Sequence, residues 1–233
     1  MATDDRSTFA LNSTATLPLV SVVIRTTGQP GLPRALAVVA SQTWRPLEIV
    51  LVDAEAAGRT LRDYADLPVR VVGAEWPMER AQAANAGLAA ARGDWIALLD
   101  DDDTIEPEHV ATLVRTARLA GLPVAYSQAR LIGPDGVQQT YGGPFSRAAL
   151  LRSNCIPLHT GLFSRQLVEQ GARFDESLGP VAEWDFWLQL AAMADFAFTG
   201  KPTATWRAEA GEAARMPPPE ALQEKLRQKW QAG

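Results

Sequence analysis

The chain has 233 residues, of which 47% are hydrophobic and 21% are charged, which is the composition of a folded domain and not of a disordered chain. Its net charge of −5 gives no electrostatic footprint for nucleic acid or for an anionic lipid surface. With one cysteine, Cys155, and two histidines, an internal disulfide and a typical structural zinc site are both excluded.

Polar segments are predicted to flank one domain. Residues 1–16 are polar and are expected to form a flexible leader. Residues 17–210 are expected to fold as a single domain, and residues 211–233 as a tail that ends in a helix. Packing or solvation is favoured for that helix over docking of a protein partner. No apolar run has the length of a membrane span or the form of a signal peptide, so the expected location is cytoplasmic.

Strands and helices alternate along the first half of the domain. Apolar, β-branched runs predict buried strands at 17–24, 47–52, 69–72 and 95–99. Helical spacing predicts helices at 34–42, 78–91 and 104–120. Such an alternation folds as a mostly parallel sheet with helices on its faces. The fold class predicted for the chain is therefore α/β.

The second half follows a different pattern. A hairpin is predicted from 124–132 and 137–140, a strand at 156–163, an amphipathic helix at 183–193 and a closing strand at 196–206. The helix carries Trp184, Phe186 and Trp187, for which packing in the core is favoured over a sugar-stacking platform. A structural role is favoured for His159, over one near an acceptor, and a surface position for His109.

Four consecutive aspartates, Asp100 to Asp103, follow the predicted strand at 95–99. Adjacent carboxylates repel one another unless a cation neutralises them, and oxygen ligands suit Mg²⁺ or Mn²⁺. A solvated acidic turn with Asp103 as the cap of the next helix is the alternative. Because parallel strands end at one edge of a sheet, Asp53 is expected on the same edge as the acidic run.

Four segments, taken together, resemble glycosyltransferase family 2. In chain order they read PLVSVVIRTTG, SQTWRPLEIVLVD, RAQAANAGLAAARGDWIALLDDDDTIEP and GARFDESLGPVAEWDFWLQLA. The resemblance covers about residues 18 to 207 and implies a GT-A fold. It makes 17–120 a nucleotide-binding half and 121–210 an acceptor half. It also implies an inverting enzyme that moves a sugar from a nucleotide diphosphate, expected to be a UDP-sugar, to the hydroxyl of a glycan or other acceptor.

The same resemblance assigns site residues. It places at the nucleotide Thr26, Thr27, Asp53, Arg80, Asn85 and Asp101. The alternatives are structural roles without a ligand: a strand-end turn for Asp53, a surface ion pair for Arg80 and a helix-surface amide for Asn85. The family's Asp-x-Asp metal element corresponds to Asp100 and Asp102, with Asp103 as a further ligand of Mg²⁺ or Mn²⁺.

The catalytic base implied by the resemblance lies in the helix at 183–193. Glu183 and Asp185 fall where the family has its acidic pair, and one carboxylate would take the proton of the acceptor hydroxyl. Asp185, two residues on, would point elsewhere on a helix. The alternative is a structural role, in which both acids stabilise the N-terminus of the helix through the helix dipole.

Four positions depart from the family pattern. Arg25 stands in place of a proline, Ala54 in place of a second aspartate and Ala182 in place of the first acid of the pair, while Ala208 and Glu209 occupy the place of a histidine. These departures leave open a non-catalytic domain that binds a nucleotide, a glycan or a protein. A nucleotidyltransferase is disfavoured because the loop after the first strand has only two glycines.

Overall fold

The structure is a computed structural model that describes residues 17–28, 30–133, 136, 138–207 and 220–231. The predicted leader at 1–16, the tip of the hairpin and the departures at Ala208 and Glu209 lie outside the described residues. Among the described helices, none is both long and apolar enough to cross a membrane.

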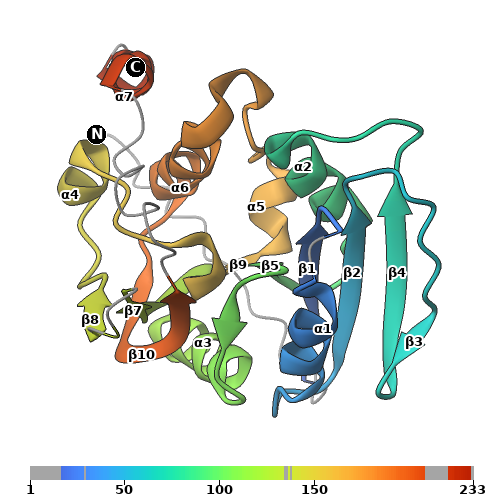
Figure 1. The fold of residues 1–233 in the computed structure, drawn as a ribbon. Coiled ribbons are helices and arrows are strands. Elements are labelled where there is room, and N and C mark those ends of the chain that lie inside the picture. Colours follow the sequence, from blue (N-terminus) through green and yellow to red (C-terminus); the bar gives the residue numbers. More distant parts are fainter. Residues whose placement is uncertain (1–16, 29, 134–135, 137, 208–219, 232–233) are drawn as a thin grey trace.

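A ten-stranded mixed sheet forms the centre of the domain (Figure 1). Its order is β3-β4-β2-β1-β5-β9-β7-β10-β6, with β8 paired to β7. The four neighbours β4, β2, β1 and β5 are parallel, whereas β9 runs antiparallel to both β5 and β7. The predicted α/β class and mostly parallel sheet are confirmed. The strands are β1 (Val20–Thr26), β2 (Leu47–Asp53), β3 (Asp63–Tyr64), β4 (Leu67–Gly73), β5 (Trp95–Asp100), β6 (Thr104–Ile105), β7 (Val124–Ile132), β8 (Gln138–Tyr141), β9 (Gly161–Ser164) and β10 (Ala197–Arg207).

Helices cover both faces of the sheet, because each central strand buries apolar residues on both sides. One apolar cluster packs α1 and α3 against one face, and a second packs α2, α5 and α6 against the other. The helices are α1 (Leu32–Ala40), α2 (Arg80–Ala90), α3 (His109–Ala120), α4 (Arg147–Arg152), α5 (Arg165–Glu169), α6 (Ala182–Met193) and α7 (Glu220–Gln231), with short 3-10 turns η1 (Leu158–Thr160) and η2 (Glu176–Val181).

Close packing of α2 on the sheet depends on Gly87. A Cβ atom at this position would lie 2.3 Å from Cγ1 of Val23 on β1. The alanine-rich sequence of α2 therefore does more than favour a helix, since small side chains let the helix approach the strands.

The region after the acidic run differs from the prediction. A helix was expected from Thr104, but Thr104 and Ile105 form β6 against β10, and α3 begins only at His109. The alternative in which Asp103 caps this helix is wrong, because the N-cap position of α3 is Glu108. Local propensity missed the strand because its partner lies about a hundred residues later in the chain.

The predicted surface position of His109 is also wrong. Its side chain is 1% exposed, and its Nδ1 atom lies 2.7 Å from Oγ1 of Thr203 on β10. Burial, together with the charge of His159, lowers the pKa of His109 to about 3. The ring is therefore neutral at physiological pH and belongs to the packing between α3 and β10.

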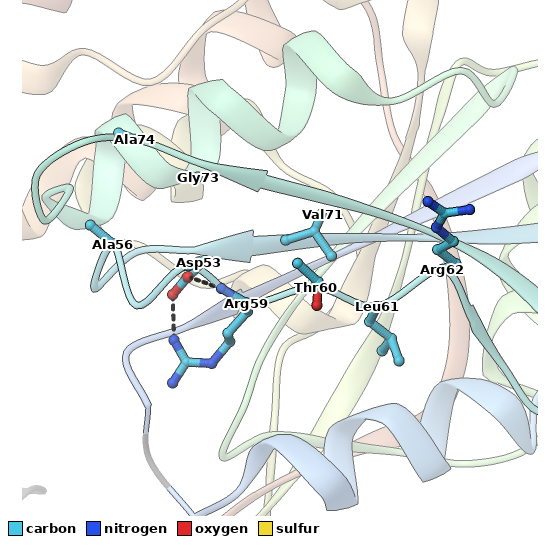
Figure 2. A pocket seen from close by; sticks show the side chains of 10 residues that line it. Asp53, Ala56, Arg59, Thr60, Leu61, Arg62, Val71, Gly73 and Ala74 are labelled. Atoms are coloured by element: carbon cyan, nitrogen blue, oxygen red, sulfur yellow. Dashed lines mark hydrogen bonds and ion pairs between the residues drawn. The ribbon is translucent and has the colours of Figure 1, made fainter.

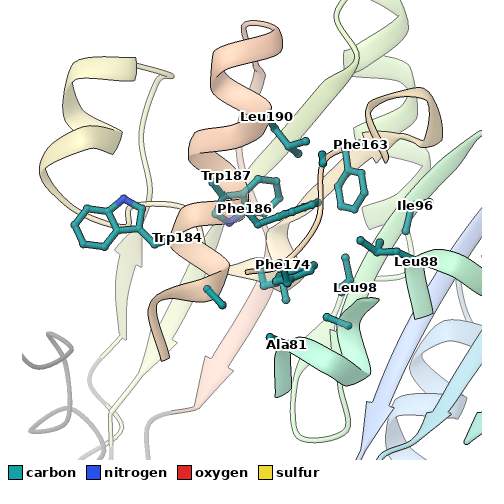
Figure 3. Packing of buried hydrophobic residues seen from close by; sticks show 14 of the residues in the cluster. Ala81, Leu88, Ile96, Leu98, Phe163, Phe174, Trp184, Phe186, Trp187 and Leu190 are labelled. Atoms are coloured by element: carbon teal, nitrogen blue, oxygen red, sulfur yellow. The ribbon is translucent and has the colours of Figure 1, made fainter. Parts of the chain in front are cut away.

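The aromatic residues of α6 pack in the core, as predicted (Figure 3). Phe186 stacks on Phe174 at 4.3 Å between ring centroids, and Trp187 lies so close to Gly161 that a Cβ there would be 2.4 Å from its ring. The helix is not amphipathic, however, since its buried residues include Trp184, which faces α4 and donates a hydrogen bond to Leu150 O. The side of α6 that carries Trp184 is therefore buried by α4.

Candidate functional site

The carboxyl ends of β1, β2 and β5 meet at one edge of the sheet. Their parallel register places Thr26 beside Asp53 and Arg25 beside Asp100. Thr26, Asp53 and Asp100, which the sequence assigns to the site, therefore lie close together at this edge. This edge is where parallel α/β sheets bind their ligands.

Three aspartates of the acidic run form a cluster at this edge. Asp100, Asp102 and Asp103 each offer a carboxylate oxygen, and these oxygens all lie within 4.8 Å of one another. Asp102 is exposed, and the pKa of its carboxyl is raised by partial burial and by the negative charges of Asp103 and Asp100. The cluster fits a hard divalent cation, because its donors are all carboxylate oxygens.

Asp101 turns away from the cluster. Its side chain is buried and accepts a 2.7 Å hydrogen bond from Oγ1 of Thr26. The loop after β1 lies directly on this turn, since a Cβ at Gly31 would be 2.1 Å from the backbone oxygen of Asp101. Thr26 and Asp101 therefore fix the loop at the site, while Thr27 beside them is exposed.

Two arginines join Asp100 to Glu183. Arg25 donates from Nε and Nη2 to the two oxygens of Asp100, at 2.7 and 2.9 Å, and from Nη2 to Oε1 of Glu183 at 3.0 Å. Arg80, at the start of α2, donates to Oδ2 of Asp100 and, at 2.9 Å, to the same Glu183 oxygen. The candidate base on α6 is thus tied to the acidic cluster on β5.

These arginines decide the protonation of both acids. Burial by itself opposes ionisation of Asp100 and Glu183, but the charges of Arg25 and Arg80 outweigh it. The pKa of each carboxyl is therefore lowered. Glu183 is ionised at neutral pH, which is the form that can accept a proton.

A buried histidine contacts the other side of the cluster. His159 on η1 has a 5% exposed side chain, and its Nδ1 atom lies 3.1 Å from Oδ2 of Asp103. Burial opposes its protonation, but Asp103 outweighs this effect and the pKa of His159 is raised. From the sequence, a structural role is favoured for this residue over one near an acceptor, and the structure makes it a partner of a candidate metal ligand.

A pocket of about 390 Å³ opens at the end of β2 (Figure 2). Asp53 lines it and is held by Arg59, whose backbone N–H donates to Oδ2 at 3.0 Å and whose guanidinium binds Oδ1. Burial opposes ionisation of Asp53, but these hydrogen bonds outweigh it and its pKa is lowered. The remaining pocket wall comes from the segment 56–62 and from β4.

Asn85 and Asp185 are not brought to this edge by the structure. The Asn85 amide exchanges two 2.9 Å hydrogen bonds with the backbone of Phe174, so it links α2 to the segment before η2. Asp185 is fully buried and accepts hydrogen bonds from Trp230 Nε1 at 2.8 Å and Lys229 Nζ at 3.0 Å. It therefore holds the C-terminal helix α7 on the domain.

Trp230→Phe is expected to lower the free energy of unfolding by about 1.5 kcal/mol, because it removes the hydrogen bond to the buried Asp185 carboxylate while an aromatic ring stays in place. Urea unfolding followed by circular dichroism measures this. Glu224→Gln on the same helix removes only an exposed ion pair with Arg227 and should change stability by less than about 0.5 kcal/mol. Equal stability of wild type and Trp230→Phe would show that Asp185 does not anchor α7 through this bond.

The sequence missed two arginines of the site, Arg25 and Arg59. Arg25 stood out only as a departure from the family pattern, although a guanidinium inside the strand run VSVVIRT was itself a signal that a buried acid lies nearby. Arg59 lies in a stretch without a periodic pattern, so only the path of the chain back toward Asp53 reveals its role.

Comparisons with known proteins identify the family and the fold. Residues 21–168 match the sequence model of "Glycosyl transferase family 2". Over 167 residues the chain is 30% identical to the succinoglycan biosynthesis protein ExoO of Rhizobium meliloti, in an alignment that covers 62% of the chain but only 47% of ExoO. The chain therefore spans less than half the length of this relative.

Two solved structures share the fold. Residues 1–349 of TarS of S. aureus, in complex with UDP-GlcNAc, superpose with a TM-score of 0.69 at 17% identity, over 84% of this chain and 60% of that fragment. The mannosyltransferase PcManGT of Pyrobaculum calidifontis, in complex with GDP-Man and Mn²⁺, superposes with a TM-score of 0.63 at 18% identity, over 84% of this chain and 58% of PcManGT. The match of more than half of the chain to the family model, together with this fold, shows that the chain belongs to glycosyl transferase family 2.

Proposed function

We propose that the chain transfers a sugar from a nucleotide diphosphate donor, a UDP-sugar, to an acceptor hydroxyl with inversion. The observation that carries this proposal is the meeting of three groups at one sheet edge: the acidic cluster, the pocket at Asp53 and the Glu183 carboxylate. Family membership and the nucleotide-sugar complexes of TarS and PcManGT support the donor class.

Glu183 is the proposed general base. Both arginines bind its Oε1 atom, so Oε2 is the oxygen proposed to accept the proton of the acceptor hydroxyl. In the reaction the acceptor oxygen attacks the anomeric carbon and its proton passes to Glu183. The bond between that carbon and the diphosphate oxygen breaks at the same time, and its electron pair leaves with the nucleotide diphosphate. Attack opposite the leaving group gives inversion.

The acidic cluster is the proposed site of a divalent cation. Asp100, Asp102 and Asp103 would hold Mg²⁺ or Mn²⁺, which when bound supplies positive charge to the departing diphosphate. Asp100 keeps its negative charge through Arg25 and Arg80. Arg80 is 65% exposed at this edge, so its guanidinium can also reach a donor phosphate.

The pocket at Asp53 is proposed to receive the base of the nucleotide. An ionised carboxylate only accepts hydrogen bonds, so Asp53 would recognise an N–H group such as that of uracil. Arg59 supplies donors beside it for a carbonyl oxygen. This pairing suits an imide edge, which uracil presents.

A thermal melting series tests the proposal. UDP with Mn²⁺ is expected to raise the melting temperature, because a ligand at about 100 times its dissociation constant stabilises the folded state by about 2.7 kcal/mol. The series compares UDP, GDP, ADP and CDP, each with Mn²⁺ and with EDTA. A shift with GDP alone would replace the uridine assignment, and no shift with any nucleotide would contradict the proposed function.

A further inference from the structure

Arg25 is an unusual residue for the interior of a parallel strand. Its side chain is 5% exposed, and it follows the buried apolar run of Val22, Val23 and Ile24 on β1. A buried guanidinium is costly unless its donors are paired. Here the pairing is bidentate to Asp100 on the adjacent strand, with a further hydrogen bond to Glu183 on α6.

The second arginine of this network is placed differently. Arg80 contacts the same two acids, but its side chain is 65% exposed and it begins a helix at the edge of the sheet. An exposed arginine can exchange a carboxylate for a phosphate oxygen when a donor enters. Arg25 has no such freedom, because its strand and its two acidic partners fix its guanidinium.

We propose that Arg25 is a positioning residue that holds the Glu183 carboxylate against the acidic cluster while Arg80 turns to the donor. The inference rests on the function proposed above, since it assigns a support to the base of that reaction. Arg25 is not among the residues that line the base pocket, and its contact with the acidic cluster is to Asp100. Its loss should therefore affect the rate of the chemical step and not the binding of the nucleotide.

The experiment measures release of nucleotide diphosphate from UDP-GlcNAc and from GDP-mannose with Mn²⁺, with water as the acceptor. Arg25→Met is expected to lower kcat about 10²-fold, because a base displaced by about 1 Å loses that much. The dissociation constant for the nucleotide, measured by calorimetry at a saturating concentration of Mn²⁺, should stay within about threefold. Arg80→Met should instead weaken nucleotide binding and raise KM.

Two further variants keep the test decisive if Arg25→Met does not fold. Arg25→Lys preserves the charge, but one ammonium group cannot span Asp100 and Glu183 as the planar fork does, so kcat should still fall. In Arg25→Ala, millimolar guanidinium should restore part of kcat, whereas urea at the same concentration should not. Arg165→Met is the matched control, because it breaks an ion pair with Glu169 on α5, outside the site.

The outcomes separate this inference from the proposed function. A folded Arg25→Met or Arg25→Lys with the kcat of the wild type would overturn the inference and leave the function standing. Equal losses of nucleotide affinity and of kcat would also overturn it, because they would make Arg25 a donor-binding residue. A wild-type protein that binds no nucleotide and releases none would instead overturn the function itself.

Discussion

Glu183→Gln is expected to reduce sugar transfer about 10²–10⁴-fold, the range that general-base help contributes. The amide keeps the size of the side chain and still accepts hydrogen bonds from Arg25 and Arg80, but it cannot take a proton. This loss is measured as the rate of nucleotide release from a sugar donor. The donor is the one whose nucleotide raises the melting temperature. The dissociation constant of the nucleotide should remain close to that of the wild type.

Asp185→Asn is the matched control for this prediction. It is also an acid in the first turn of α6, but it faces Trp230 and Lys229 of α7. We expect it to keep the wild-type rate in the folded protein, at some cost in stability. A full rate in Glu183→Gln would show that Glu183 is not the base. Loss of rate in Asp185→Asn alone would make Asp185 the base in its place.

Replacement of Asp102 by Asn is expected to have two effects of opposite sign. Binding of Mn²⁺ should weaken by more than about 100-fold, since even the loss of a supporting partner of a metal ligand costs up to that much. The protein without metal should become more stable, because burial and the charges of Asp103 and Asp100 raise the pKa of Asp102. Removing this repulsion stabilises the folded state above the pH at which the Asp102 carboxyl ionises. Asp103 is kept in this variant because it also contacts His159.

Electron paramagnetic resonance of Mn²⁺ and the melting temperature in EDTA measure the two effects separately. Glu169→Gln, an exposed acid of α5, serves as the control and should change neither. Mn²⁺ affinity equal to that of the wild type in Asp102→Asn would show that the cation does not bind at this cluster. A lower melting temperature in EDTA would show that the Asp102 carboxylate stabilises the fold through contacts other than a metal.

The course of the main chain could largely be predicted from the sequence. The runs LPLVSVVI, LEIVLV and WIALL have a local signature, since strands buried on both faces are apolar along their whole length. The alternation with helices then limits the sheet to parallel order, and Asp53 and the acidic run follow at strand ends. Short elements such as β6 escaped prediction, because two residues carry little propensity and depend on a distant partner.

The α/β class, the family resemblance and the presence of acids at the edge of the sheet follow from the amino-acid sequence alone. Which charges meet one another becomes apparent in the folded structure, because this depends on strand register and helix rotation. Register sets Arg25 beside Asp100, and α6 brings Glu183 to them from 158 residues away along the chain. Residues two positions apart on a helix differ by about 200° in direction, so Asp185, two residues after Glu183, faces the C-terminal helix instead.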